Sequence, residues 1–268
     1  MDKSEGPFAG LLLRVAAPLA RLRRIPILGD LLSWASRQLV PSDTLLWAQI
    51  QQGLAQGLWI RVNPRTGHDV LQGIGEAAVQ QALQQYLRPG MTFYDLGANI
   101  GFFSLIAARL IGPSGRVVSF EADPEIAARL RENLARNNFT HAVVEQKAVW
   151  SEPTTVAFAR VDSSVSPDRG LGHVSTENSS TASTIQVEAV SLDQYVASHP
   201  SPDFLKCDVE GAELAVFQGA QNLLQNYRPI LLVEMHSEEN HHRLGTEFTQ
   251  LGYLCQNVDA NHLLALPQ

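Results

Sequence analysis

A strand–turn–helix–strand stretch near the middle of the chain carries the residues best suited to chemistry. A β-prone run, Thr92–Leu96, leads into a turn that contains Gly97 and Gly101, and a second apolar run, Arg116–Phe120, is followed by Glu121. Glycines allow the backbone to turn sharply and to approach a ligand closely. Helical spacing after the turn predicts a helix whose free N–H groups point to the same place. The stretch therefore indicates a βαβ unit with a ligand site at its turn.

The polar residues of this stretch indicate which ligand it binds. Glu121 lies where a carboxylate can accept both hydroxyls of a ribose. Asp95 would repel a pyrophosphate, and the Gly97-x-x-x-Gly101 spacing differs from the dinucleotide fingerprint G-x-G-x-x-G, which argues against an NAD-dependent oxidoreductase. A cationic nucleoside, such as S-adenosyl-L-methionine, fits Asp95, Asn99 and Glu121 better. The alternative is an ordinary βαβ unit whose glycines serve only its turns.

Further polar residues follow two other apolar, strand-like runs. Asp208 and Glu210 come directly after Phe204–Cys207, and a buried-type run from residue 230 ends at Glu234 and His236. Because the carboxyl ends of parallel strands meet at one edge of a sheet, these side chains are expected to share a crevice with the glycine turn.

Two more ligand candidates lie outside these runs. Ala148 follows the strand-like run Ala142–Glu145, where an adenine edge can meet backbone groups, and the nearby Trp150 either stacks on the base or packs in the core. Glu76 stands at the start of a helical run and either reaches the ligand or caps the helix.

Size and composition favour one large α/β domain with an extension. The chain has 268 residues, a net charge of −7 and 45% hydrophobic residues. Repeated β-then-helix steps and a terminal hairpin predict a doubly wound, Rossmann-like sheet over residues 73–268, with one antiparallel strand at its edge. The acidic balance argues against nucleic acid as a partner. Cys207 and Cys255 lie in apolar runs, as expected of free thiols in the cytoplasm, and no apolar run is long enough for a transmembrane helix.

Residues 1–72 are predicted to form an N-terminal helical extension. Its first part, residues 8–40, is cationic and amphipathic, and Thr44–Trp59 also has helical spacing. Such a segment can serve as a lid, as the arm of a homo-dimer or as a peripheral membrane contact. A second segment of interest, Asp162–Ser183, is rich in Ser, Thr and Gly and is typical of a long mobile loop.

The motifs described so far resemble the FkbM-type family of class I S-adenosylmethionine-dependent methyltransferases. The resemblance covers about Gly73–Glu234 and rests on three stretches: Asp95–Gly101, Phe120–Pro124 and Lys206–Glu213. It implies a seven-stranded methyltransferase fold and methyl transfer, usually to a hydroxyl of a sugar, polyketide or other natural product.

The resemblance also implies roles for individual residues. Gly97, Asn99 and Gly101 would frame the methionine part of the cofactor, and Asp95 would serve its amino end. Glu121 would bind the ribose. The acidic motif at Asp208 and Glu210 would lie beside the transferred methyl group.

Transfer to a hydroxyl requires a base as well as positioning. His236 is the first candidate and Asp208 the second, whereas Lys206 could act only with a strongly lowered pKa. A divalent metal on Asp208, Glu210, Glu234 and His236 is conceivable, but no spacing fixes a coordination geometry, so the prediction is an enzyme without a metal. The alternative function is a catalytically silent cofactor-binding adaptor that acts through residues 8–40.

Overall fold

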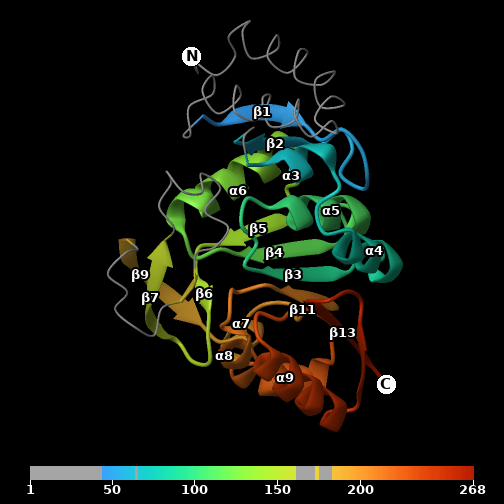
Figure 1. Ribbon diagram of the computed structural model, residues 1–268, viewed down its shortest axis with the longest axis vertical. Helices are drawn as coiled ribbons and strands as arrows, with labels where there is room; N and C mark the ends of the chain where they lie inside the picture. Colours follow the sequence, from blue (N-terminus) through green and yellow to red (C-terminus); the bar gives the residue numbers. More distant parts are fainter. Residues whose placement is uncertain (1–43, 64–65, 161–172, 175–182) are drawn as a thin grey trace, which may run out of the picture.

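A seven-stranded sheet forms the centre of the protein (Figure 1). The computed structural model describes residues 44–63, 66–160, 173–174 and 183–268. The strand order is β12-β13-β11-β10-β3-β4-β5. The strands are β3 Thr92–Leu96, β4 Arg116–Phe120, β5 Ala142–Glu145, β10 Phe204–Cys207, β11 Ile230–Glu234, β12 Tyr253–Asn257 and β13 His262–Pro267.

The direction of the strands places the binding crevice. Strands β11, β10, β3, β4 and β5 are parallel, and β13 is antiparallel to both β11 and β12. The predicted terminal hairpin is confirmed, but its antiparallel strand lies between β11 and β12 and not at the edge. After β3 the chain proceeds to β4 on one side, and it later returns through β10 on the other. Ligands of open α/β sheets bind at such a switch point, at the carboxyl ends of the strands.

Helices cover both faces of this sheet, which confirms the doubly wound α/β prediction. One face carries α4 (Ala77–Tyr86), α5 (Phe102–Ile111) and α6 (Pro124–Arg136). The other face carries α7 (Leu192–Val196), α8 (Glu213–Gln218) and α9 (Glu238–Gln250). The described residues also form two short helical elements, α3 (His68–Gln72) and the π-helix η2 (Leu223–Tyr227). Each face buries its own apolar cluster, as the layered arrangement requires.

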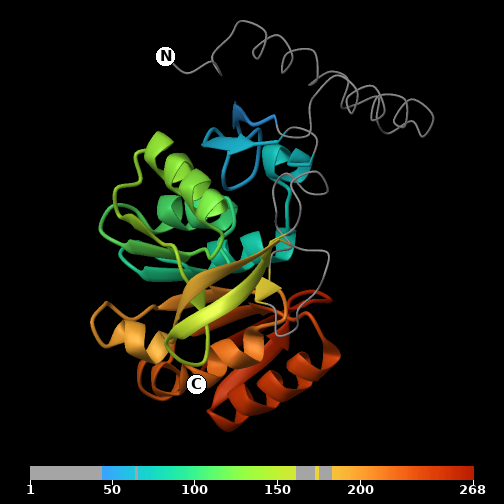
Figure 2. The ribbon, with the colours of Figure 1, turned by 90° about the vertical axis from the view of Figure 1, so that its left-hand side faces the viewer.

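A second, four-stranded sheet lies beside the first and was not predicted as a unit (Figure 2). Its order is β6 (Ala148–Val149), β9 (Ser183–Val190), β7 (Thr154–Arg160) and β8 (His173–Val174). Of its four strands, only β7 and β9 show the apolar alternation of strands in the sequence. Most of the predicted mobile loop, 162–183, lies outside the described residues.

The described part of the N-terminal extension contains a β-hairpin. β1 (Leu46–Gln49) pairs with β2 (Trp59–Val62), so the helix predicted for Thr44–Trp59 is wrong. The connecting turn contains Gly53 and Gly57, both at positive φ, and this turn signal outweighs the helical spacing.

Hydrogen bonds fix the hairpin to helix α6 and to its C-cap residue, Asn137. The Trp59 N–H donates to Asn137 Oδ1 and the Arg61 N–H donates to Asn133 Oδ1, both at 2.8 Å. The division of the chain at residue 72 stays a prediction. Residues 8–40, with the predicted membrane contact, lie outside the described part, and none of the described helices is long and apolar enough to span a membrane.

Candidate functional site

The glycine turn follows β3 and has the left-handed backbone conformation that glycine favours. Gly97 and Gly101 have φ values of 72° and 90°, and Asn99 between them has a φ of 49°. A methyl group added at Gly97 would overlap with the carbonyl oxygen of Asp208, and one added at Gly101 would overlap with the Leu130 side chain. The sequence attributed these glycines to a close ligand. The structure shows that contacts within the protein already require them.

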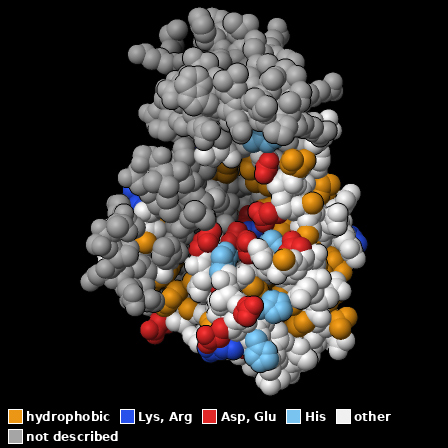
Figure 3. All heavy atoms as spheres, in the orientation of Figure 1, with side chains coloured by type: hydrophobic (Ala, Val, Ile, Leu, Met, Phe, Trp, Pro, Cys, Tyr) orange, Lys and Arg blue, Asp and Glu red, His pale blue; other side chains and the backbone are white. Residues whose placement is uncertain are grey.

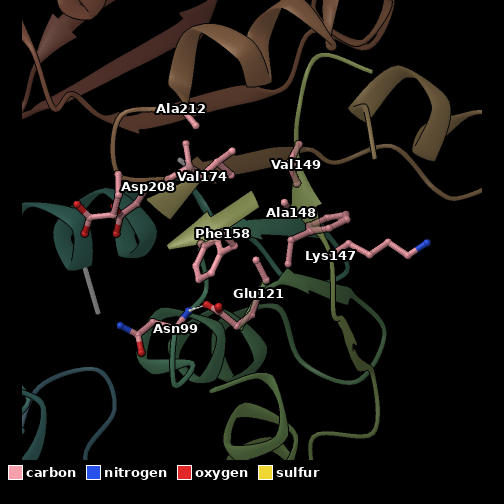
Figure 4. A pocket seen from close by; sticks show the side chains of 14 residues that line it. Asn99, Glu121, Lys147, Ala148, Val149, Phe158, Val174, Asp208 and Ala212 are labelled. Atoms are coloured by element: carbon pink, nitrogen blue, oxygen red, sulfur yellow. Dashed lines mark hydrogen bonds between the residues drawn. The ribbon is translucent and has the colours of Figure 1, made fainter. Parts of the chain in front are cut away.

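A cavity opens between this turn and the second sheet (Figure 4). Five of the predicted cofactor residues line it: Gly97, Asn99, Glu121, Ala148 and Asp208. The remaining wall consists of Phe120, Ala122, Lys147, Val149, Phe158, Val174, Val209, Glu210 and Ala212. The other three predicted cofactor residues, Glu76, Asp95 and Gly101, do not line the cavity.

Glu121 is a buried carboxylate held by two backbone groups. Its Oε2 accepts from the Asn99 N–H at 2.9 Å and its Oε1 accepts from the Asp123 N–H at 2.8 Å. Burial raises the pKa of Glu121 to about 7, although the two N–H groups oppose this shift. A carboxylate has about four acceptor sites, so two remain for hydroxyl donors in the cavity.

The opposite wall of the cavity is apolar. Phe158 on β7 and Val174 on β8 line it together with Ala148 and Val149 (Figure 4). An aromatic ring here can stack on a flat base. Phe158 was missed in the sequence, where only the strand pattern of its segment was seen, and Trp150 is not among the lining residues.

A buried lysine joins two of the predicted carboxylates. Lys206 Nζ lies 3.1 Å from Asp208 Oδ2 and 3.8 Å from Asp95 Oδ1, and Ser104 Oγ donates to Asp95 Oδ2 at 2.5 Å. Burial disfavours the charge of Lys206, but the attraction of Asp208, Asp95 and Glu76 outweighs it and raises the pKa of Lys206. Because a lowered pKa was the condition for a base, the structure contradicts that role for Lys206.

His236 follows β11 and is oriented by a buried glutamate. Its Nδ1 lies 2.7 Å from Glu213 Oε1, while Nε2 lies 3.3 Å from Glu210 Oε2 and 3.8 Å from Asp208 Oδ1. The Glu213 side chain is fully buried, and it also accepts from the Gly211 N–H and from Asn240. The hydrogen bonds to Glu210 and Glu213 raise the pKa of His236 to about 10.

Glu213 appears in the sequence analysis only as the last residue of the stretch Lys206–Glu213, without a role of its own. The structure makes it the partner that fixes the ring of His236. The sequence offered one signal for this role: Glu213 is the last residue of the acidic motif Lys206–Glu213, which resembles the family.

Two groups of side chains at this edge have the spacing of metal ligands. One consists of Asp208, Glu234 and His236, and the other consists of Glu76, Glu234 and His262; the ligand atoms of each lie within 4.8 Å of one another. Figure 3 shows acidic and histidine side chains gathered around a hollow on this face. Asp208 and Glu210, which line the cavity, connect it with these groups.

The strand order and the cavity at the switch point define the class I, Rossmann-like methyltransferase fold. Residues 95–255 match the family described as "Methyltransferase FkbM domain". This match covers more than half of the chain, and the protein therefore belongs to that family, as the motifs had predicted.

Relatives with named functions match only part of the chain. Hexuronic acid methyltransferase AglP of Haloferax volcanii is 32% identical over 165 residues, which are 61% of this chain and 63% of that protein. An arsenite methyltransferase of Halobacterium salinarum is 40% identical over 52 residues, 19% of this chain and 13% of that protein. The chain thus spans less than two thirds of these relatives. A crystal structure of methyltransferase FkbM from Methylobacillus flagellatus KT has a TM-score of 0.49 and 16% identity, and covers 74% of this chain and 60% of that one.

The cofactor of this domain is S-adenosyl-L-methionine, and the cavity fits it. Glu121 retains acceptor sites toward the cavity, where a ribose presents two hydroxyl donors. Apolar side chains line one wall, against which a base would stack, and carboxylates line another part of the cavity, where a sulfonium cation would be held. The assignment of individual residues to parts of the cofactor stays a prediction.

Proposed function

We propose that this protein methylates a hydroxyl oxygen of a sugar or another small natural product. The observation that carries the proposal is the Glu213–His236 pair, whose outer ring nitrogen faces Asp208 at the edge of the cofactor cavity. A histidine that is fixed through Nδ1 by a buried carboxylate, with Nε2 at the edge of the cavity, has the arrangement of a general base once an acceptor hydroxyl takes the place of Glu210 at Nε2. The named activity of AglP, on a hexuronic acid, supports a sugar as the acceptor.

The cofactor supplies an activated methyl group, so the protein has to position the acceptor and remove its proton. In this proposal His236 Nε2 accepts the hydroxyl proton, Glu213 stabilises the imidazolium that forms, and Asp208 orients the acceptor or takes the proton itself. With a pKa of about 10, His236 is mostly protonated at neutral pH. Its pKa falls when a cationic sulfonium lies nearby, because like charges disfavour the imidazolium.

The charge of this edge favours a hydroxyl over a carboxylate as the acceptor. A hexuronic acid offers both groups, but a carboxylate needs no base. It would also approach Glu76, Asp208, Glu210 and Glu234, whose negative charges repel it and are offset only in part by Lys206 and His236. A neutral hydroxyl avoids this repulsion and uses the histidine.

The proposal is tested by the bond that the methyl group forms. The protein is incubated with S-adenosylmethionine carrying a ¹³C-methyl group and with neutral sugars, hexuronic acids and polyketide alcohols, and the products are examined by ¹³C–¹H NMR. A methyl ether is the expected product. A methyl ester, or an N-methyl or C-methyl product, would refute O-methylation of a hydroxyl. Binding of the cofactor without transfer to any acceptor would favour the adaptor alternative.

A further inference from the structure

A second histidine–carboxylate cluster lies next to His236. It consists of Glu76, just before α4, Glu234 at the end of β11, and His262 at the start of β13. Glu234 and His262 are opposite one another in the antiparallel pair β11–β13. The three residues come from distant parts of the chain, and only the fold brings them together.

His262 points an unpaired nitrogen into this cluster. Its side chain is only 5% exposed, and its Nδ1 lies 2.9 Å from both carboxylate oxygens of Asp259. Because a carboxylate only accepts hydrogen bonds, Nδ1 carries a proton, which leaves Nε2 as the nitrogen that presents a lone pair when the ring is neutral. Among the described residues, this Nε2 has no hydrogen-bond partner.

The lone pair faces two further acceptors. His262 Nε2 lies 3.4 Å from Glu76 Oε2 and 3.6 Å from Glu234 Oε2. When the ring is neutral, three electron-rich atoms face one another, and a metal ion can take the place of the proton that otherwise lies between them. Ligand atoms bound to one ion at about 2.1 Å lie roughly 3 to 4 Å apart, which agrees with both distances.

We propose that Glu76, Glu234 and His262 bind a divalent metal ion. Two carboxylate oxygens and one imidazole nitrogen suit an ion such as Mn²⁺. Asp259 supplies the outer carboxylate that typically fixes a metal-bound histidine through its other nitrogen.

The ion would lie beside the catalytic edge, because Glu234 also belongs to the group with Asp208 and His236. There it can hold oxygens of the acceptor and lower the pKa of a bound hydroxyl. This role rests on the proposed function, whereas the binding of the ion does not.

The test measures Mn²⁺ binding to chelator-treated full-length protein, without cofactor or acceptor, by the electron paramagnetic resonance signal of free Mn²⁺. One tight ion per chain is expected. Glu76→Gln and Glu234→Gln should each weaken its binding at least tenfold, and His262→Gln further. Glu76 is 42% exposed, so its variant should fold, which circular dichroism checks. Glu239→Gln, on the exposed face of α9, is the matched control and should bind Mn²⁺ normally.

No tight Mn²⁺ binding, or equal binding by Glu76→Gln and Glu234→Gln, would overturn the proposal and would leave His262 as a simple ion-pair partner. Methyl transfer is measured separately on the same samples. Transfer without metal binding would refute only the metal site, and metal binding without transfer would refute only the proposed function.

Discussion

The two sides of the site are built in different ways. On the cofactor side, one continuous segment, Gly97 to Glu121, forms the polar wall of the cavity with its backbone turn and a single buried carboxylate. The acceptor side is assembled from separate segments that supply Glu76, Asp208, His236 and other charged side chains. The geometry of a continuous segment follows from the local spacing of its residues, whereas the geometry of an assembled cluster depends on the whole sheet.

The electrostatics of the two sides differ in the same way. Glu121 is buried, and among the described residues only two backbone N–H groups donate to its carboxylate. Burial outweighs these two donors and raises the pKa of Glu121 to about 7. On the acceptor side, carboxylates alternate with Lys206, His236 and His262, and mutual attraction raises the pKa of each of these three bases. The cofactor side is therefore expected to respond to pH near neutrality. The acceptor side should respond both near neutrality, because burial and Asp208 raise the pKa of Glu234 to about 7, and at alkaline pH through His236.

The largest effect on stability is expected for Gly97→Ala, because Gly97 of the cofactor side packs against Asp208 of the acceptor side. The new methyl group would overlap with the Asp208 carbonyl at a φ of 72°, so the loss of folding free energy should reach roughly 3 kcal/mol or more. Thermal and urea denaturation measure it. Gly57→Ala has a similar φ of 79° but open space around it, and should lose only about 1 to 2 kcal/mol. Equal losses would show that the contact with Asp208 does not matter.

Substitution of His236 separates transfer from cofactor binding. His236→Ala should slow methyl transfer by about a hundredfold or more, because the base is lost, while the affinity for S-adenosylmethionine stays the same. Transfer rates and calorimetric titration give the two quantities. His242→Ala, on the exposed part of α9, is the control. An unaltered rate for His236→Ala would remove it as the base.

Substitution of Glu121 should mainly weaken cofactor binding, in contrast to substitution of His236, which should mainly slow transfer. Glu121→Ala should weaken cofactor binding roughly tenfold to a hundredfold through the loss of charged hydrogen bonds to the ribose. The wild-type affinity should rise as the pH rises through about 7, because the carboxylate is the better acceptor, and binding should release protons. In the variant this pH dependence should vanish. Calorimetry in buffers of different ionisation enthalpy measures both effects, and unchanged affinity would refute the ribose assignment.

The smallest effect is a shift in the pH profile. Glu213→Gln keeps the shape of the side chain but removes its charge, so the pKa of His236 should fall from about 10 and the alkaline rise in transfer rate should move to lower pH. The profile moves to lower pH because transfer needs the neutral imidazole, which becomes the main form at a lower pH when the pKa of His236 falls. A profile identical to that of the wild type would show that the titrating base is not His236.

Sequence reasoning succeeded where the chemistry was local. The strand–turn–helix order around Gly97 and Glu121 indicated the fold class, apolar runs near the C-terminus indicated the terminal hairpin, and the resemblance of three motifs indicated the family. Phe158 was missed because its place in the cavity depends on a second sheet that the sequence pattern did not reveal.

The failures share a physical cause, which is contact between residues far apart in sequence. The segment Leu46–Gln49 was predicted to be helical, but it is a strand because it pairs with Trp59–Val62. Lys206 was kept as a base candidate because its neighbours Asp95 and Asp208 could not be placed. The pairing of His262 with Glu76 required the complete sheet.

A crystal structure with S-adenosylhomocysteine would test the central claim most directly, since the claim is that the cavity holds the cofactor and directs its methyl group toward His236. The account predicts ribose hydroxyls hydrogen-bonded to Glu121, the base against Phe158, and the sulfur facing Asp208 and His236. A nucleoside bound elsewhere, or a sulfur directed away from these two residues, would contradict it.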